Sequence, residues 1–369
     1  MFGLTGISKT HVWQIVKTIL IACIGGFLFT LLHFPLAWML GPLAAVLVWQ
    51  VAFKSKLYWP RSLRNGGQML LGYNMGLAFT AESAQQIAVS LPSMVISTAL
   101  LTGSSLGLAF LIAKRTGISL PSSIMGCIPG GISQMVPLSE EIEGAEPTIV
   151  TFMQTIRMLI VTFMVPFVAV HGLAAAGDSS RLQTQSVLSV SDTSWSMIPV
   201  AVVLVLLAAV FAVRLKFPNP WLIGPLIVSA AISASGMALP HLPQLVVIIA
   251  QLCIGIYLGQ GIKLEALSGW RRLLPYSIAG SVLLVGMTLA SAYLLSRIQP
   301  ISFVTAFLSI APGGLPEMGV TAAAIHADVS KVAAYQLFRV FFVLFIIPVA
   351  LKKIFRRSIS RQHSQDYYP

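Results

Sequence analysis

The fold is decided by a stretch that reads FPLAWMLGPL at residues 34–43 and returns as FPNPWLIGPL at residues 217–226. Each stretch lies between two apolar runs, and the two stretches are 183 residues apart. The same offset relates further identical residues over about a hundred positions, which chance does not produce. The matched pairs are Gln68 with Gln251, Gly72 with Gly255, Gly76 with Gly259, Glu82 with Glu265, Pro92 with Pro275, and Pro129-Gly130-Gly131 with Pro312-Gly313-Gly314; after a gap of one residue, Gln154, Arg157 and Pro166 match Gln336, Arg339 and Pro348. This register predicts two copies of one structural unit.

The composition places this repeat in lipid. Of the 369 residues, 56% are hydrophobic and 9% are charged, whereas soluble domains are about 45–50% apolar and about 25% charged. So few charges cannot cover a surface that faces water. The net charge of +12 comes from small groups of Lys and Arg between apolar runs, as is typical of cytoplasmic loops. Direct binding of nucleic acid is not expected, because no folded basic surface is available.

We therefore expect an all-α integral membrane protein with two repeats, each of about five transmembrane helices and one interrupted segment. The expected spans are residues 13–32, 36–53, 66–80, 87–113 and 148–170 in the first copy, and 195–213, 220–238, 244–262, 273–296 and 331–351 in the second. The interrupted segments are Ser122–Leu138 and Ser302–Ala324, each broken by Pro-Gly-Gly. The expected domains are a first membrane repeat (1–172), a polar linker (173–194), a second membrane repeat (195–351) and a basic cytoplasmic tail (352–369).

The positions of the basic residues favour two inverted copies. If the Pro-Gly-Gly segments enter and leave on the same side, each copy crosses five times and the copies are inverted. Only Arg181, Arg297 and Lys331 then lie outside, whereas six Lys or Arg residues lie outside if every segment crosses. The positive-inside rule therefore predicts a multi-pass protein with inverted repeats and both termini in the cytoplasm.

The two Pro-Gly-Gly segments are the first candidates for a functional site. Inverted repeats with Gly/Pro-interrupted segments at matching positions are typical of secondary transporters, because non-helical backbone is tolerated at membrane depth only inside protein or beside water. Pro129, Gly130 and Gly131, with Pro312, Gly313 and Gly314, would present helix-end dipoles and free amides to a ligand. Alternatively, the glycines only allow close helix packing.

One arginine in the last apolar helix of each copy is the second candidate. Arg157 and Arg339 each lie about ten residues into the helix, and Gln154 and Gln336 precede them by three residues on the same face. A charge at that depth requires a partner. The guanidinium groups could bind an anionic group of a solute, or each could hold the carbonyl groups of its own interrupted segment.

Acidic residues near the second break provide further candidates. Glu317 occupies the position of Gln134 in the other copy, and a carboxylate beside a broken helix could carry a proton or Na⁺. The alternative is a fixed salt bridge from Glu317 to Arg339. Asp328, which matches Glu146, is better explained as a cap on the last helix than as a ligand.

No pattern in the sequence supports catalysis. The six histidines have no metal-ligand spacing, and there is no phosphate-binding glycine loop or nucleophile motif. Cys23, Cys127 and Cys253 lie in apolar runs, as packing residues do. We expect no enzyme activity, no catalytic residue, no metal and no cofactor.

The ordered motifs resemble the AbrB-duplication family of bacterial membrane proteins. The resemblance rests on the doubled Pro-x-x-Trp-x-x-Gly-Pro-Leu pattern, Pro-Gly-Gly with a Met soon after, and Gln-x-x-Arg in the closing helix, and it covers about residues 15–350. Members of this family have been named ammonia monooxygenase or regulator of gene expression. The resemblance also implies the broader group of antiporters and symporters with two inverted bundles and paired broken helices. It brings no established substrate or catalytic residues.

Two functions follow as expectations. The first is a secondary transporter in the bacterial inner membrane, coupled to H⁺ or Na⁺, for a small anionic or zwitterionic solute. The second is a membrane-embedded sensor that affects gene expression indirectly on a transporter-like scaffold. The expected partners are the lipid bilayer, the solute and the coupling ion, and a second copy of the chain in a homodimer is a further candidate.

Overall fold

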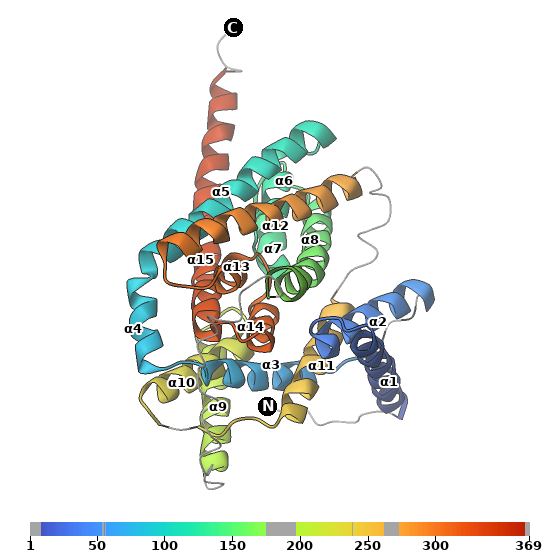
Figure 1. The fold of residues 1–369 in the computed structure, drawn as a ribbon. Helices are drawn as coiled ribbons and strands as arrows, with labels where there is room; N and C mark the ends of the chain where they lie inside the picture. Colours follow the sequence, from blue (N-terminus) through green and yellow to red (C-terminus); the bar gives the residue numbers. More distant parts are fainter. Residues whose placement is uncertain are drawn as a thin grey trace. The chain divides into compact units, whose positions relative to one another are not determined.

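The computed structural model describes residues 9–53, 55, 57–174, 197–237, 239–261 and 273–365. In this part of the chain, all regular structure is helical (Figure 1), which confirms the predicted fold class. The helices are α1 (Lys9–Leu31), α2 (Ala37–Phe53), α3 (Arg61–Gly76), α4 (Ala81–Val89), α5 (Leu91–Thr116), α6 (Leu120–Cys127), α7 (Ile132–Glu141), α8 (Pro147–Phe167), the π-helix η1 (Val168–Ala174), α9 (Met197–Arg214), α10 (Pro220–Ala234), α11 (Gln244–Gln260), α12 (Leu273–Ile298), α13 (Phe303–Ile310), α14 (Leu315–Ala324) and α15 (Val329–Gln365). Nearly all of the predicted linker 173–194 lies outside the described residues, and the predicted tail is part of α15 up to Gln365.

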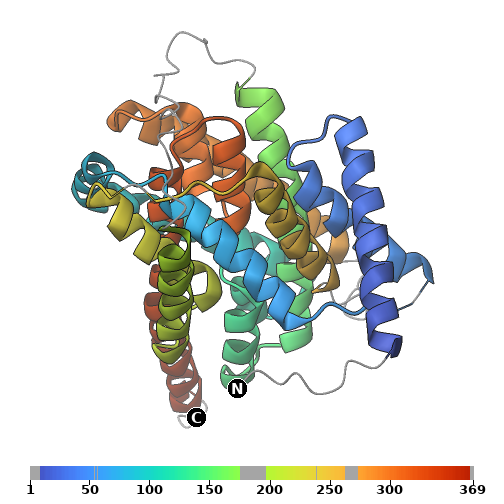
Figure 2. The ribbon, with the colours of Figure 1, turned by 90° about the horizontal axis from the view of Figure 1, so that it is seen from below.

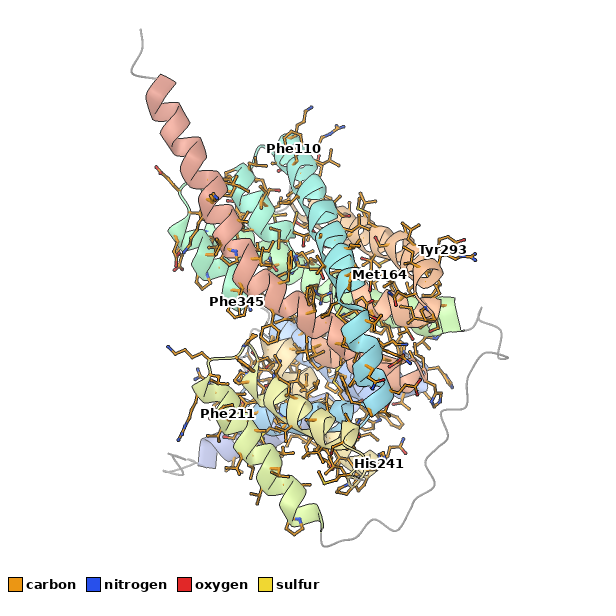
Figure 3. The ribbon with its side chains drawn as sticks, turned by 90° about the vertical axis from the view of Figure 1, so that its left-hand side faces the viewer. Phe110, Met164, Phe211, His241, Tyr293 and Phe345 are labelled. Carbon is orange, nitrogen blue, oxygen red and sulfur yellow. The ribbon has the colours of Figure 1, made fainter. Side chains whose placement is uncertain are left out.

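The surface of the described helices is apolar in the way that lipid requires. Five helical stretches are long and apolar enough to cross a membrane: Val12–Leu31, Leu91–Thr116, Pro147–Leu173, Leu273–Ile298 and Val329–Phe355. Large side chains point outward from these helices, as Figure 3 shows for Phe110 on α5 and Phe345 on α15, which are 62% and 64% exposed. The charged side chains Arg157, Arg339 and Glu317 are instead buried. This distribution fits a protein whose solvent is lipid.

Helix boundaries recur at the offset found in the sequence. Helix α2 begins at Ala37 and α10 begins at Pro220, which is 183 residues later. The same spacing separates the starts of α6 and α13 and the starts of α7 and α14. The turn before α2 has left-handed backbone at His33 and Leu36, and the turn before α10 has it at Lys216 and Asn219. Matching sequence thus gives matching local structure, down to unusual backbone angles.

The described chain forms two compact units, and each unit contains parts of both sequence copies. Unit 1 consists of Met1–Ala88, Pro166–Ile262 and Pro316–Lys331. Within it, α2 of the first copy packs against α11 of the second, and α3 packs against α10 (Figure 2). Such reciprocal contacts are those of an interface with two-fold symmetry.

Glycines allow the close approach of these helices in unit 1. A Cβ atom at Gly72 would collide with the carbonyl oxygen of Leu222, and a Cβ atom at Gly255 would collide with that of Met39. These two contacts are equivalent under the 183-residue offset. Gly72 and Gly255, which match each other in the repeat, are therefore needed where the backbones of α3 and α10, and of α11 and α2, touch.

Unit 2 consists of Val89–Val165, Lys263–Leu315 and Val332–Pro369. In it, the long apolar helices α5 and α12 pack against each other, while α6 packs on α5 and α13 packs on α12 (Figure 1). Ser119 accepts a hydrogen bond from the amide of Ser122 at the start of α6, and Ser302 accepts one from Thr305 at the start of α13. These N-caps fix where the two short helices begin.

One predicted span begins and ends earlier than the apolar pattern suggests. We expected residues 66–80, but α3 covers Arg61–Gly76. The extended residue Pro60 is the N-cap, so the helix starts directly after it and includes the polar residues Arg61 and Arg64. The predicted span 87–113 likewise corresponds to α5, which begins at Leu91, after the short helix α4.

Candidate functional site

The helical backbone is interrupted at both Pro-Gly-Gly segments. Helix α6 ends at Cys127 and α7 begins at Ile132; helix α13 ends at Ile310 and α14 begins at Leu315. Proline has no N–H and cannot continue the helical ladder. In the first break the amide of Gly130 donates to the carbonyl of Ile128 at 2.7 Å, and in the second the amide of Gly313 donates to that of Ala311 at 2.8 Å. The two breaks have the same local geometry.

Arg157 on α8 holds the first break together. Its Nη1 donates to the carbonyls of Cys127 and Ile128, and its Nη2 donates to the carbonyl of Gly130 at 2.9 Å and to Oε1 of Gln154. The amide of Gln154 donates in turn to the carbonyls of Met125, at 2.6 Å, and Ile128, at 3.1 Å. The side chain of Arg157 is 7% exposed.

Arg339 on α15 makes the same set of contacts at the second break. Its Nη1 donates to the carbonyls of Ile310 and Ala311, and its Nη2 donates to Gly313 and to Oε1 of Gln336. The amide of Gln336 donates to the carbonyls of Leu308 and Ala311 at 2.7 and 3.1 Å. Each Gln-Arg pair therefore binds the carbonyl end of its own broken helix, as the second interpretation of these arginines predicts.

These contacts have a clear electrostatic basis. The last carbonyl groups of a helix have no partner inside the helix, and they form the negative end of its dipole. A buried guanidinium group satisfies them, and they compensate part of its charge. The acceptors that Arg157 and Arg339 meet in unit 2 are all neutral, and the two positive charges act on each other. Among the described residues of unit 2, the groups that bind these two buried positive charges are thus dipoles without a net charge.

The first break lies against the helix that carries Arg339. A Cβ atom at Gly130 would meet Cγ1 of Val343 at 3.2 Å, and Val343 is one helical turn after Arg339. Ile128, Met135 and Ile347 belong to the same buried apolar cluster as Val343. The break is therefore enclosed by protein, as non-helical backbone at membrane depth must be.

Glu317 and Gln134 have different surroundings although they are equivalent in sequence. Glu317 lies in the first turn of α14, in unit 1, and is 4% exposed; its Oε2 has no hydrogen-bond partner among the described residues. Gln134 lies in the first turn of α7, in unit 2, and is only partly buried. Because Glu317 and Arg339 belong to different units, the predicted salt bridge between them stays a prediction.

Asp328 has the role of a helix cap. Its Oδ1 accepts hydrogen bonds from the amide of Lys331, at 3.0 Å, and from the hydroxyl of Ser330, at 2.6 Å, at the start of α15. This agrees with its interpretation as a cap. At the equivalent place in the first copy, the hydroxyl of Ser122 accepts from the amide of Glu146 at 2.7 Å.

The sequence analysis missed one polar residue near Arg157. Ser277 on α12 lines a cavity together with Arg157, and its buried hydroxyl has no hydrogen-bond partner in the part of the chain that the structure describes. A comparison of the two copies could have found it, because the equivalent residue of the first copy is Met94. Among the described residues, no group of three or more His, Cys, Asp or Glu side chains could hold a metal ion.

The fold and these two breaks define a class of protein. It is all-helical in the described residues, has helices apolar enough to cross a membrane, and has one broken helix at the same position of each sequence copy. Residues 38–355 match the model of the family described as transition state regulatory protein AbrB. The chain is 28% identical over 357 residues to an uncharacterised protein, YhjN, of Bacillus subtilis (strain 168), covering 89% of this chain and 90% of that protein. It is 26% identical over 326 residues to a candidate regulator, AbrB, of Escherichia coli (strain K12), covering 88% and 92%. The chain belongs to the AbrB family.

Proposed function

We propose that this protein is a secondary transporter that moves a small anionic or zwitterionic solute across the bacterial inner membrane. The proposal includes inverted copies that cross the membrane with both termini in the cytoplasm. The observation that carries it is the pair of helix breaks, each held by a buried Gln-Arg pair. Irregular backbone in lipid is disfavoured by several kcal/mol for each unsatisfied group, so a duplicated break that serves only packing has no evident advantage.

The charge of the breaks supports an anionic or zwitterionic solute. Two buried guanidinium groups place positive charge beside the breaks. Helices α7 and α14 begin directly after the breaks, and the first amides of a helix attract negative groups. Both features favour a carboxylate or a similar group over a cation.

The contacts also favour H⁺ over Na⁺ as the coupling ion. In transporters with broken helices, unwound carbonyls and the C-terminal ends of half-helices coordinate the cation. Here the carbonyls of Ile128, Gly130 and Gly313 accept hydrogen bonds from arginine. A Na⁺ ion would have to displace a guanidinium group, whereas Glu317, with a free Oε2, can bind a proton without displacing any contact.

One observation favours a sensor instead. The Nη groups of both arginines are already bound to carbonyl groups of their own breaks. A solute would have to compete with these contacts or bind elsewhere. The relative in Escherichia coli is also named as a candidate regulator. A scaffold that binds a solute and changes shape, without moving it, would have the same contacts.

A transport assay separates the two functions. Metabolite profiling of a deletion strain identifies solutes whose level changes, and each is then tested in proteoliposomes that contain a pH-sensitive dye. A transporter moves the solute and protons together under an imposed gradient, and empty liposomes under the same gradient provide the control. If correctly folded protein binds the solute but moves neither solute nor protons, the sensor is the better description.

The inverted arrangement has an independent test. We expect residues 54–64, 114–115 and 214–216 in the cytoplasm, together with residues 263–272, which lie outside the described residues. Single cysteines are introduced at these places in a variant without Cys23, Cys127 and Cys253. A membrane-impermeant reagent should label them only in opened cells. Labelling near Lys216 from outside intact cells would exclude the inverted arrangement.

A further inference from the structure

Unit 2 contains a cavity that is lined in part by Arg157 and by Cys127, the last residue before the first break. The cavity lies between α5, α6, α8 and α12 and has about 280 Å³ of empty space, part of it open to the surroundings. The space that a small particle can occupy inside it is limited, which excludes large ligands. Its lining is mostly apolar, so the few polar groups in it determine what it can bind. These groups are on Cys127, Arg157, Ser277 and Ser281.

Two of the polar groups have no hydrogen-bond partner among the described residues. The Nε–H group of Arg157 is buried and unpaired, although both Nη atoms are fully used at the break. The hydroxyl of Ser277, on a side chain that is 4% exposed, is also unpaired. Ser281, one turn later, directs its own hydroxyl to the carbonyl of Ser277 at 2.7 Å. Unpaired buried donors are rare and require a partner.

The charge of the cavity indicates the kind of partner. Arg157 meets only neutral acceptors, and its charge acts on that of Arg339. A buried charge without a counter-ion is strongly unfavourable in lipid. A water molecule would satisfy the two donors but would add no negative charge beside Arg157. An anion satisfies the donors and the charge together.

The residues at the positions that are equivalent in the repeat differ from those that line this cavity. Several residues that line the cavity are replaced at the 183-residue offset, including three that correspond to a larger residue: Ser277 corresponds to Met94, Gly126 to Ser309, and Gly280 to Ser97. Met94 is buried, with 1% of its side chain exposed. These larger residues would occupy space beside Arg339 that the smaller ones leave open beside Arg157.

We propose that this cavity binds one small monovalent anion of halide size between Nε of Arg157 and the hydroxyl of Ser277. The anion is a fixed counter-ion of the first break and stabilises the unit that holds both arginines. This site lies within unit 2 and does not depend on transport. A mostly apolar lining favours anions that lose water easily, so bromide binds at least as well as chloride, and a large organic anion such as gluconate does not enter.

Thermal unfolding of the purified protein tests the site. Unfolding is followed in detergent while chloride replaces gluconate at constant ionic strength. We expect the unfolding temperature to rise saturably by roughly 2–5 °C, because a ligand that binds only the folded state stabilises it. In crystals grown with bromide, an anomalous peak should lie beside Arg157.

Two variants test whether chloride acts at this cavity. Each introduces the residue that the other copy has at the equivalent position. Ser277→Met copies Met94 and fills the cavity, and Gly280→Ser copies Ser97, where the only close neighbour of a new Cβ is the flexible end of Ile112. Both should abolish the response to chloride. Ser291→Met is the matched control on the same helix, because the Ser291 hydroxyl is exposed, and it should keep the full response.

Other outcomes overturn the proposal. If the wild-type protein does not respond to chloride, or if Ser277→Met and Ser291→Met respond equally, the cavity holds water only. If Ser277→Met and Gly280→Ser both fail to fold, Ser277→Ala tests whether the hydroxyl of Ser277 binds the anion. That variant keeps the volume and removes one donor, so it should raise the half-saturating chloride concentration about tenfold, which corresponds to one lost hydrogen bond of about 1.4 kcal/mol. An unchanged value contradicts the proposal.

Discussion

The two helix breaks share every contact that holds their backbone and differ in the residues around them. At both, a Gln-Arg pair binds the same carbonyl groups of the preceding short helix. The first break, however, is followed by Gln134 and adjoins a cavity, whereas the second is followed by the buried carboxyl group of Glu317. The shared contacts are those a common fold needs. The differences are therefore where an asymmetric function should be sought.

The largest effect on folding is expected from the shared contacts. Arg157→Gln and Arg339→Gln each leave several buried carbonyl groups without a donor. Breaking such a buried charged network typically costs about 3–5 kcal/mol. We expect both variants to show low yield and a strongly lowered unfolding temperature, measured by differential scanning fluorimetry in detergent. If Arg157→Gln folds normally while Arg339→Gln does not, the two Gln-Arg pairs do not stabilise their breaks equally. The proposed equivalence of the two breaks is then wrong.

A smaller loss is expected at the glycines that bring the two copies together in unit 1. Gly72→Ala and Gly255→Ala each place a methyl group against a carbonyl oxygen of the facing helix. Overpacking of this kind costs about 1–3 kcal/mol, and the two losses should be similar because the contacts are equivalent. Gly103→Ala is the control, since nothing lies within 4 Å of its added Cβ; it should be neutral or slightly stabilising. Equal effects at all three positions would contradict the reciprocal packing.

The smallest effect is expected at the start of the closing helices. Asp328→Ala removes the cap of α15 and should lower the free energy of unfolding by about 1 kcal/mol. Glu146→Ala is the matched change in the first copy, where the amide of residue 146 bonds to Ser122 and does not depend on the carboxylate. Thermal unfolding of both variants measures the difference. A larger loss for Glu146→Ala than for Asp328→Ala would show that the caps are assigned wrongly.

Much of the local structure could be predicted from the sequence. The repeated motifs and the Pro-Gly-Gly segments give the order of the helices and the places where they break, since Pro removes the N–H that the ladder requires. The position of Gln154 and Arg157 on one helix face gives their shared orientation. The choice between anion binding and backbone binding could not be made, because a guanidinium group donates equally well to a carboxylate and to carbonyl groups.

Long-range features could not be predicted. Nothing local to α2 indicates that it packs on α11 of the other copy. The cavity beside Arg157 depends on Gly126 of α6 and on Ser277 and Gly280 of α12. These two helices are far apart in sequence, and each residue alone is ordinary in a membrane helix. The left-handed backbone at Leu36 is equally unexpected, because β-turn preferences favour Gly or Asn there. Such features follow from packing between distant segments, which a single sequence does not display.

The central claim is the proposal that one carboxyl group, Glu317, binds the coupling proton of a transporter with two structurally matched breaks. The test is Glu317→Gln in proteoliposomes, which copies Gln134 of the other break. Its matched control is the reciprocal change, Gln134→Glu. We predict that Glu317→Gln is well expressed and folds with an unchanged unfolding temperature, but no longer couples movement of the solute to a proton gradient, while Gln134→Glu retains coupling. Solute accumulation by Glu317→Gln with the same dependence on pH and sodium as the parent protein would contradict the claim.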